Sequence, residues 1–508
     1  MLLNSFEFFV FLLLVSILYF IVPKKAKALI LLIASIVFYL LWNVFNTVIL
    51  ILTALSTYAI GILMDQVHLQ AQGAVEATDL KPVRRKKRLL ILGIVLLVGE
   101  LFFYKYYGFT ALQINILLSS GGNPSVPMLA DGIFIPLGIS FYIFQTIGYL
   151  VDVYRGKVKA ERNVIDFLLF ITFFPKIIQG PIERADGFLE QIHKIEEKGR
   201  FDIHRVCNGL ITFIWGLFIK MVIADRIAIV VDQVFSTYFV YGTVELAFAA
   251  IGYAIQIYCD FAGYSAMALG AAQVFGFDLI DNFNVPYFSV STREFWRRWH
   301  ISLSAWFRDY VYIPLGGSRR GKWRKRLNVM LVMLVSGIWH GAGWSFIFWG
   351  LLHGAYQVAG EISAPWREKL QKRLNTPVGS ASQRLGSMIV TFVLVDIAWI
   401  FFRAPRLMVA LDYIRIMFSR FNPWVLFDGS LLKLGLDQIE MNVLTIALPM
   451  LVIVDYIQYK KAIRIDRMLE NQCLWFRWAV IILLFTLIWV CGEYGPAFNS
   501  SSFIYQSF

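Results

Sequence analysis

The chain has 508 residues, of which 58% are hydrophobic and only 16% are charged, and its mean hydropathy is +0.64. Soluble domains are about a quarter charged, so this composition excludes an ordinary soluble protein and predicts a polytopic membrane protein. The net charge of +13 requires no nucleic-acid partner, because cytoplasmic loops of membrane proteins are enriched in Lys and Arg. The four cysteines form no C-x-x-C pair, so we expect no disulfide framework and no metal site.

The apolar runs predict an all-α fold with about 11–12 transmembrane helices. The first run lacks a cleavage signal and is interpreted as a retained helix. Two further stretches do not suit a simple span: 164–182 carries prolines and a lysine, and 281–313 carries many charges. We expect re-entrant or interfacial helices there, lining a cytoplasmic funnel. The candidate spans are 6–22, 28–42, 47–64, 89–107, 133–151, 206–223, 244–265, 327–341, 344–360, 386–402, 441–458 and 476–491.

The charges of the connecting loops predict the orientation in the membrane. Basic and uncharged loops alternate over the first five spans, which predicts that the N-terminus lies outside the cytoplasmic (inner) membrane. The loops 361–385 and 460–475 are basic and are therefore expected in the cytoplasm. We expect a single membrane-embedded domain, 1–508, with a core at 133–360. The segment 476–508 would supply the last helix and an extracellular tail.

The stretch from Arg293 to His340 concentrates the features that suggest chemistry. Ten Lys or Arg residues lie between Arg293 and Arg326, and an apolar run then ends at His340. A histidine within or beside the hydrocarbon region is a functional candidate, and a neutral imidazole can act as a general base. His300, in FWRRWHISLSAW, is the second candidate. The small residues around His340 could leave a cavity or allow close helix packing; they are Ser336, Gly337, Gly341 and Gly343. The alternative to a catalytic role is that His340 only hydrogen-bonds a neighbouring helix.

The other four histidines are less suited to catalysis. His68, His193 and His204 lie in polar loops and are expected at the solvated surface. If one helix continued past His340, His353 would lie on a different face, because thirteen residues separate the two.

Several other chemistries lack their motifs. There is no H-x4-D, no G-x-S-x-G elbow and no H-E-x-x-H. The P-loop-like run 316–322 is followed by Trp323 where Ser or Thr is needed to bind Mg²⁺. Proton-coupled transport remains an alternative because carboxylates lie in apolar runs, namely Glu100, Asp260 and Asp396. A scramblase-like or structural role in a secretion complex is a third hypothesis.

Five blocks, in order along the chain, resemble the membrane-bound O-acyltransferase (MBOAT) family. Specifically, they resemble its bacterial polysaccharide-modifying branch, which serves alginate and peptidoglycan O-acetylation and D-alanine transfer to teichoic acid. The blocks are PLGISFYIFQTIGYLVDVYRG (136–156), FFPKIIQGPIER (173–184), IQIYCDFAGYSAMALG (255–270), NFNVPYFSVSTREFWRRWHISLSAWFRDYVYIPLGG (282–317) and SGIWHGAGWSFIFWGLLHG (336–354). The resemblance covers most of residues 1–403 and is weakest over 404–475.

The resemblance implies that His340 is a general base and that His300 assists it, for example by stabilising the developing oxyanion. The acyl donor would be acetyl-CoA or an acyl-carrier-protein thioester on the cytoplasmic side, with no tightly bound cofactor. The acyl group, expected to be acetyl, would cross the bilayer to a polysaccharide, often with the help of an extracellular serine-hydrolase-like partner. D-alanyl transfer to teichoic acid is the related alternative. Further candidates for the channel or the donor site are Trp339, Trp299, Arg298, Ser302, Asp309, Asn282, Asp260 and Gln179.

The C-terminal sequence FIYQSF is close to a motif, FIYFQF, that ends some related systems. Its Tyr505 could accept the acyl group outside the membrane and pass it on, which would make it a covalent relay. This chain has QSF where that motif has FQF. An aromatic tail anchored at the membrane interface is the alternative.

Overall fold

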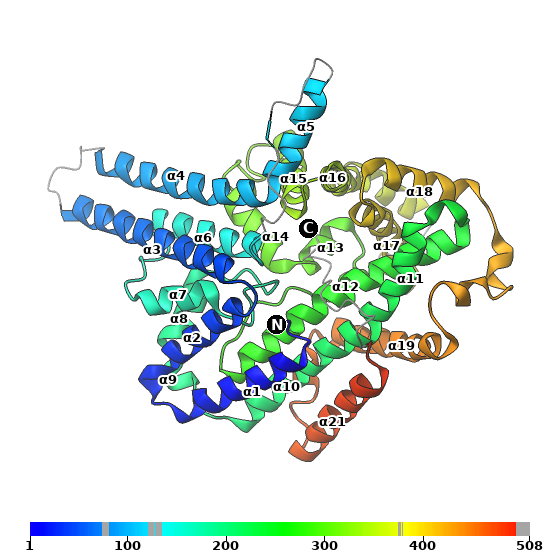
Figure 1. Cartoon of the computed structure of the whole chain (residues 1–508). Coiled ribbons are helices and arrows are strands. Elements are labelled where there is room, and N and C mark those ends of the chain that lie inside the picture. Colours follow the sequence, from blue (N-terminus) through cyan, green and yellow to red (C-terminus); the bar gives the residue numbers. More distant parts are fainter. Residues whose placement is uncertain (74–80, 120–125, 128–134, 374–376, 378, 494–508) are drawn as a thin grey trace. The chain divides into compact units, whose positions relative to one another are not determined.

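A computed structural model describes residues 1–73, 81–119, 126–127, 135–373, 377 and 379–493. These residues form helices joined by turns and contain no strand, as the composition predicted (Figure 1). They fall into two compact units. Unit 1 comprises Met1–Leu210 and Ala268–Ile280, and unit 2 comprises Ile211–Met267 and the chain from Asp281 onward. The prediction of one domain over the whole chain stays a prediction.

Unit 1 is built from the N-terminal helices (Figure 1). They are α1 (Phe6–Ile21), α2 (Lys27–Leu40), α3 (Val44–Gly73), α4 (Lys81–Leu101), α5 (Tyr107–Ser119), α6 (Ile139–Tyr154), α7 (Val164–Thr172), α8 (Ala185–His193), α9 (Ile195–Lys198) and the start of α10 (Ile203–Phe218), with a π-helical turn, η2, at Phe102–Tyr106. Helix α3 packs against α4 and α6, and α2 packs against α7. Apolar faces of successive helices thus meet in one core.

The segment expected to be re-entrant is a broken helix. Helix α7 ends at Thr172, and turns follow until α8 begins. Pro175 disfavours helix in the residue before it. The buried Lys176 amine then donates hydrogen bonds to Gln145 Oε1 at 2.8 Å and to the Phe170 carbonyl at 2.7 Å. Gly138 approaches this turn so closely that a Cβ would lie 2.2 Å from the Ile177 carbonyl oxygen.

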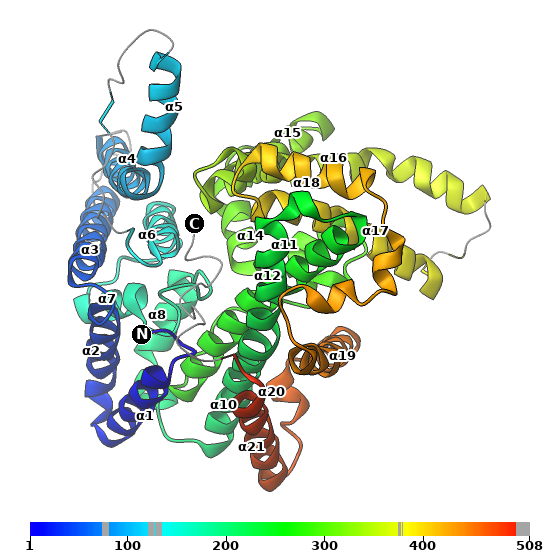
Figure 2. The same cartoon turned by 45° about the vertical axis from the view of Figure 1, so that its right-hand side comes forward.

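Unit 2 contains the longer C-terminal helices (Figure 2). They are the π-helical turn η3 (Ile219–Ala224), α11 (Asp225–Ser236), α12 (Thr243–Val274), α13 (Thr292–Arg298), α14 (Ile301–Phe307), α15 (Lys322–His340), α16 (Trp344–Arg373), α17 (Ala381–Arg403), α18 (Leu407–Ser419), α19 (Gln438–Lys461), α20 (Ile465–Met468) and α21 (Leu474–Cys491). Helix α12 passes from unit 2 into unit 1 at Ala268. Helices α15 and α16 form an antiparallel pair, and α16 packs against α17.

Seven helical segments among the described residues have the length and composition needed to cross a membrane. They are Val44–Val67, Lys81–Leu118, Ile203–Ser236, Thr243–Val274, Ala381–Arg403, Gln438–Lys461 and Leu474–Cys491. The predicted spans at 6–22, 28–42 and 133–151 correspond to the shorter helices α1, α2 and α6. The protein is therefore a multi-pass membrane protein, and the count of about 11–12 spans stays a prediction.

Candidate active site

His300 lies at a sharp break between two short helices of unit 2. Helix α13 ends at Arg298 and α14 begins at Ile301, so the charged stretch 281–313 forms short helices and no long one, as expected. His300 has φ 44° and ψ 57°, a left-handed conformation that is rare for a residue with a side chain. Such a conformation costs of order 1–3 kcal/mol and persists only where the surroundings enforce it.

Hydrogen bonds to the preceding loop enforce this break. The Ile301 amide donates to the Asn282 carbonyl at 2.9 Å, and the Asn284 amide donates to the Arg298 carbonyl, also at 2.9 Å. The Ser302 hydroxyl donates to Asn282 Oδ1 at 2.6 Å. Asn282 and Ser302, both candidates from the sequence, therefore lie together and hold the backbone of His300 in place.

His340 is the last residue of α15, and its ring is buried. Gly341 follows in an extended conformation, so the helix ends there and α16 starts at Trp344. The ring of His340 contacts Trp349 of α16 at a centroid distance of 4.9 Å and Phe402 of α17 at 5.3 Å. Three helices thus form the walls around this imidazole.

The small residues near His340 allow close helix packing. A Cβ on Gly337 would lie 2.4 Å from the Phe346 carbonyl oxygen, and a Cβ on Gly350 would lie 2.3 Å from the Met333 carbonyl oxygen. The Cα atoms of these two glycines therefore face each other across the α15–α16 contact. Gly337, one of the small residues noted in the sequence, therefore serves close helix packing.

Both candidate histidines contact the same indole. The Trp339 ring lies 4.8 Å from the ring of His340 and 6.0 Å from the ring of His300. Phe261 of α12 packs edge-on against His300 at 4.7 Å. Burial lowers the pKa of His300 to about 3, so this imidazole stays neutral at physiological pH.

His353 belongs to the same aromatic cluster, which the sequence argument did not foresee. The predicted spans 327–341 and 344–360 are confirmed as two separate helices, because Gly341 ends α15 and His353 lies on α16, so the argument for one continuous helix does not apply. The His353 ring is fully buried, lies 5.0 Å from Trp349 and accepts a hydrogen bond from Trp296 Nε1 at its Nδ1, at 3.3 Å. Since Trp349 also contacts His340, it lies between the two imidazoles. The break between the two predicted spans is the signal that could have revealed this.

Trp299, Arg298 and Asp309 differ in their surroundings. Trp299 is fully buried and packs against Phe295 at 5.4 Å and Trp399 at 5.0 Å. Arg298 pairs with Glu294, one turn earlier on α13. Asp309 pairs with its neighbour Arg308. Trp299 thus supports the loop that carries His300. The Arg298 guanidinium also donates to the Asn284 carbonyl at 3.2 Å and lies over the Tyr459 ring, so it links α13 to that loop and to α19.

Asp260 is part of a buried charge cluster. Lys220 of η3 donates hydrogen bonds to the carboxylates of both Asp260 and Asp225, and all three side chains are less than a tenth exposed. Removing one member of such a buried ion cluster leaves a buried charge without its partner, which strongly destabilises the folded protein. We therefore interpret Asp260 as fixing α12 against η3, one residue before Phe261, which contacts His300.

Two remaining candidates lie elsewhere. Gln179 belongs to unit 1, where its side chain is buried in the turn between α7 and α8 and its amide makes no hydrogen bond to any described residue. Tyr505 lies outside the described residues, so its proposed relay is not tested by the structure.

Two neighbouring cavities of unit 2 share a lining residue, and the smaller one is lined by neighbours of the clustered histidines. The outer one has a volume of about 790 Å³ and is lined by residues that include Arg293, Arg367 and Gln357. The inner one has a volume of about 160 Å³ and is lined by Gln357, Trp296 and Ser336, among others. Gln357 lines both cavities. Ser336 is one turn before His340, and Trp296 contacts His353.

These features define a polytopic helical membrane protein with three buried histidines in one aromatic cluster. The sequence model of the membrane-bound O-acyltransferase (MBOAT) family matches residues 36–394 of this chain. The chain therefore belongs to the membrane-bound O-acyltransferase family and is an acyltransferase, which uses an acyl donor.

The chain is similar to proteins named for alginate, peptidoglycan and teichoic acid. The probable alginate O-acetylase AlgI of Azotobacter vinelandii is 35% identical over 440 residues, which cover 86% of this chain and 81% of the relative. The peptidoglycan O-acetyltransferase of Helicobacter pylori is 33% identical over 368 residues, covering 68% and 67%. The teichoic acid D-alanyltransferase of Bacillus subtilis is 29% identical over 248 residues, covering 46% and 60%.

Proposed function

We propose that the protein takes an acetyl group from a cytoplasmic thioester and passes it across the membrane for O-acetylation of a polysaccharide. Acetyl-CoA or an acyl-carrier protein would supply the thioester. The relatives named as O-acetylating enzymes cover two thirds or more of this chain, whereas the D-alanyltransferase covers 46%. The observation that carries the proposal is that His300 and His340 both contact Trp339 inside a buried cluster.

In this mechanism His340 is the general base. Its neutral imidazole accepts the proton of the acceptor hydroxyl while the hydroxyl oxygen attacks the thioester carbonyl carbon. The carbon–sulfur bond then breaks, and the leaving thiolate takes the proton from the imidazolium. His300 is neutral, because its burial lowers the pKa, and it can donate one hydrogen bond to the oxyanion of the tetrahedral intermediate.

The two cavities suggest how the donor reaches the histidines. The outer cavity lies beside the basic loop 361–385, which the sequence places in the cytoplasm, and contains Arg293 and Arg367. Guanidinium groups bind phosphates well, and the donors named above carry phosphate groups. The thioester arm would then pass Gln357 and enter the inner cavity toward His340.

A bulky residue at position 357 tests this route. We expect Gln357→Trp to fill the junction between the two cavities and to reduce acetylation at least tenfold at a normal level of protein in the membrane. Gln472→Trp, in an exposed loop, is the matched control and should remain active. Full activity of Gln357→Trp would show that the donor does not pass this residue.

The central test replaces the proposed base. In cells that carry His340→Ala or His340→Gln, we expect the O-acetyl content of the surface polysaccharide to fall by about two to four orders of magnitude, the usual contribution of a general base. His204→Ala, at an exposed histidine, is the control. Retained acetylation in the His340 variants, with equal protein levels, would make His340 structural. Mass spectrometry of the polymer distinguishes acetyl from D-alanyl groups.

Tyr505 is proposed to relay the acyl group outside the membrane, and an extracellular serine-hydrolase-like enzyme would complete the transfer. In the same assay, Tyr505→Phe should abolish acetylation of the polysaccharide without lowering the amount of protein, because the variant lacks only the accepting hydroxyl. A fully active variant would exclude the relay.

A further inference from the structure

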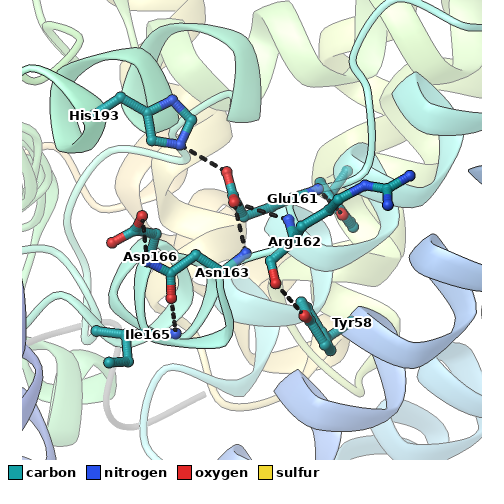
Figure 3. Close-up of polar contacts among 8 residues, drawn as sticks. Tyr58, Glu161, Arg162, Asn163, Ile165, Asp166 and His193 are labelled. Atoms are coloured by element: carbon teal, nitrogen blue, oxygen red, sulfur yellow. Dashed lines mark hydrogen bonds and ion pairs between the residues drawn. The ribbon is translucent and has the colours of Figure 1, made fainter.

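Three side chains of the types that bind metals come together in unit 1 (Figure 3). Glu161 lies in the loop before α7, Asp166 lies in the first turn of α7, and His193 is the last residue of α8. One potential ligand atom from each residue lies within 4.8 Å of the other two. His193 Nε2 is 2.8 Å from Glu161 Oε2.

The two carboxylates are oriented by hydrogen bonds. Glu161 Oε1 accepts from the backbone amides of Arg162 and Asn163, each at 2.8 Å, while Oε2 faces His193 (Figure 3). The Asn163 side-chain amide donates to Asp166 Oδ2 at 2.8 Å, and its carbonyl oxygen caps α7 by accepting from Ile165. Such outer contacts fix metal ligands in their binding orientation.

Neighbouring helices anchor the loop that carries these residues. The Glu161 amide donates to the hydroxyl of Tyr149, on α6, at 3.0 Å. The hydroxyl of Tyr58, on α3, donates to the Arg162 carbonyl at 2.6 Å. The ligands are therefore placed by long helices, which gives more precise geometry than a free loop would.

The cluster carries an excess of negative charge. Two carboxylates face one imidazole, and the Arg162 guanidinium extends away from them (Figure 3). This guanidinium pairs instead with Asp65, at 3.5 Å. The side chain of His193 is 52% exposed, whereas that of Glu161 is 9% exposed. A cation from solvent can therefore reach the site past His193 and balance the second carboxylate.

We propose that Glu161, Asp166 and His193 bind a divalent transition-metal ion such as Zn²⁺ or Mn²⁺. Imidazole nitrogen suits Zn²⁺, and carboxylate oxygen suits both ions. Tetrahedral metal–ligand bonds of about 2.0–2.2 Å place the ligand atoms about 3.4 Å apart. The Asp166 carboxylate would therefore move toward the other two ligands, and His193 Nε2, now 2.8 Å from Glu161 Oε2, would move slightly away from it. The ion would close the chain between Glu161 and His193, which includes the turn that holds Lys176 and Gln179. This site departs from the expectation that the protein binds no metal, and it is independent of the acyl-transfer proposal.

Binding can be measured on the purified full-length protein in neutral detergent. After removal of metal with a chelator, Zn²⁺ or Mn²⁺ is added and counted per chain by mass spectrometry, and the thermal unfolding midpoint is recorded. We expect one ion per chain and a midpoint that rises with the metal concentration, because the ion binds the folded state. Absence of saturable binding by either ion would overturn the proposal.

Substitutions separate a metal site from a simple ion pair. His193→Ala and Asp166→Asn should weaken binding at least tenfold, whereas His204→Ala and Asp186→Asn, at exposed positions, should not. His193→Lys keeps a positive charge beside Glu161 but removes the imidazole ligand, so it should fold normally and lose the metal-induced rise in the midpoint. An unchanged rise in His193→Lys or His193→Ala would overturn the proposal. His193 is exposed, so its variants remain informative even if Asp166→Asn does not fold.

Discussion

At the scale of single residues, an unusual left-handed backbone conformation occurs at His300, one of the two candidate catalytic histidines. Three described residues other than glycine have positive φ, and two of them, Val285 and His300, flank α13. The strained conformation of His300 is maintained by the hydrogen bonds of Asn282 and by the packing of the aromatic side chains around the ring. Strained residues gather at functional sites because the scaffold must hold them in one orientation. His300 is therefore placed by the loop as well as by its own helix.

The hydrogen bond between His353 and Trp296 gives a prediction at this scale. His353→Phe leaves the buried Trp296 N–H without its acceptor, so we expect a loss of about 1–3 kcal/mol in the free energy of unfolding. The double variant His353→Phe/Trp296→Phe removes the donor as well and should recover part of this loss. Thermal unfolding in detergent measures both. Equal destabilisation by the single and double variants would contradict the assigned hydrogen bond.

At the scale of elements, the α15–α16 pair places the candidate base. The pair crosses where Gly337 meets Gly350, and the helix break after His340 turns α16 back so that Trp349 covers the imidazole. Membrane helices associate closely through small residues because little hydrophobic force drives them together in lipid. The position of His340 thus depends on Gly337, three residues before it, and on Gly350, ten residues after it.

Gly337→Ala tests this contact. The new methyl group would lie 2.4 Å from a backbone oxygen of α16, so the helices must separate, at a cost of about 1–3 kcal/mol. Acetylation should fall as well, because Trp349 moves with α16. Gly360→Ala, on α16, is the control: its methyl group meets no atom within 4 Å, so this variant should be neutral or slightly stabilising. Similar unfolding midpoints for the two variants would refute close packing at Gly337.

At the scale of the whole molecule, charge determines the expected orientation. Basic loops alternate with uncharged ones over the first spans, and the long apolar helices of the structure support several crossings of the membrane. Lys and Arg are retained on the cytoplasmic side during insertion. This rule predicts that the N-terminus lies outside and that the loop 460–475 lies in the cytoplasm.

A native cysteine can report this orientation. Cys473 is exposed in the loop expected in the cytoplasm, whereas Cys207 and Cys259 are buried. The partly exposed Cys491 lies at the other end of α21 and is first replaced by serine. A membrane-impermeant maleimide should label the protein in permeabilised cells and fail to label it in intact ones. Cys473→Ser should abolish the signal and thereby assign it. Labelling of Cys473 in intact cells would reverse the proposed orientation.

The sequence alone determined the class of protein and its family, and it singled out two histidines whose rings both contact Trp339 in the structure. Long apolar runs and contiguous motifs are local features, so they can be read without knowing the fold. Tertiary structure decided which distant residues meet. The shared contact of His300 and His340 with Trp339, the inclusion of His353 and the pairing of Asp260 with Lys220 all depend on how separate helices pack. The cluster of Glu161, Asp166 and His193 also joins residues up to 32 positions apart, and no local pattern encodes such a contact.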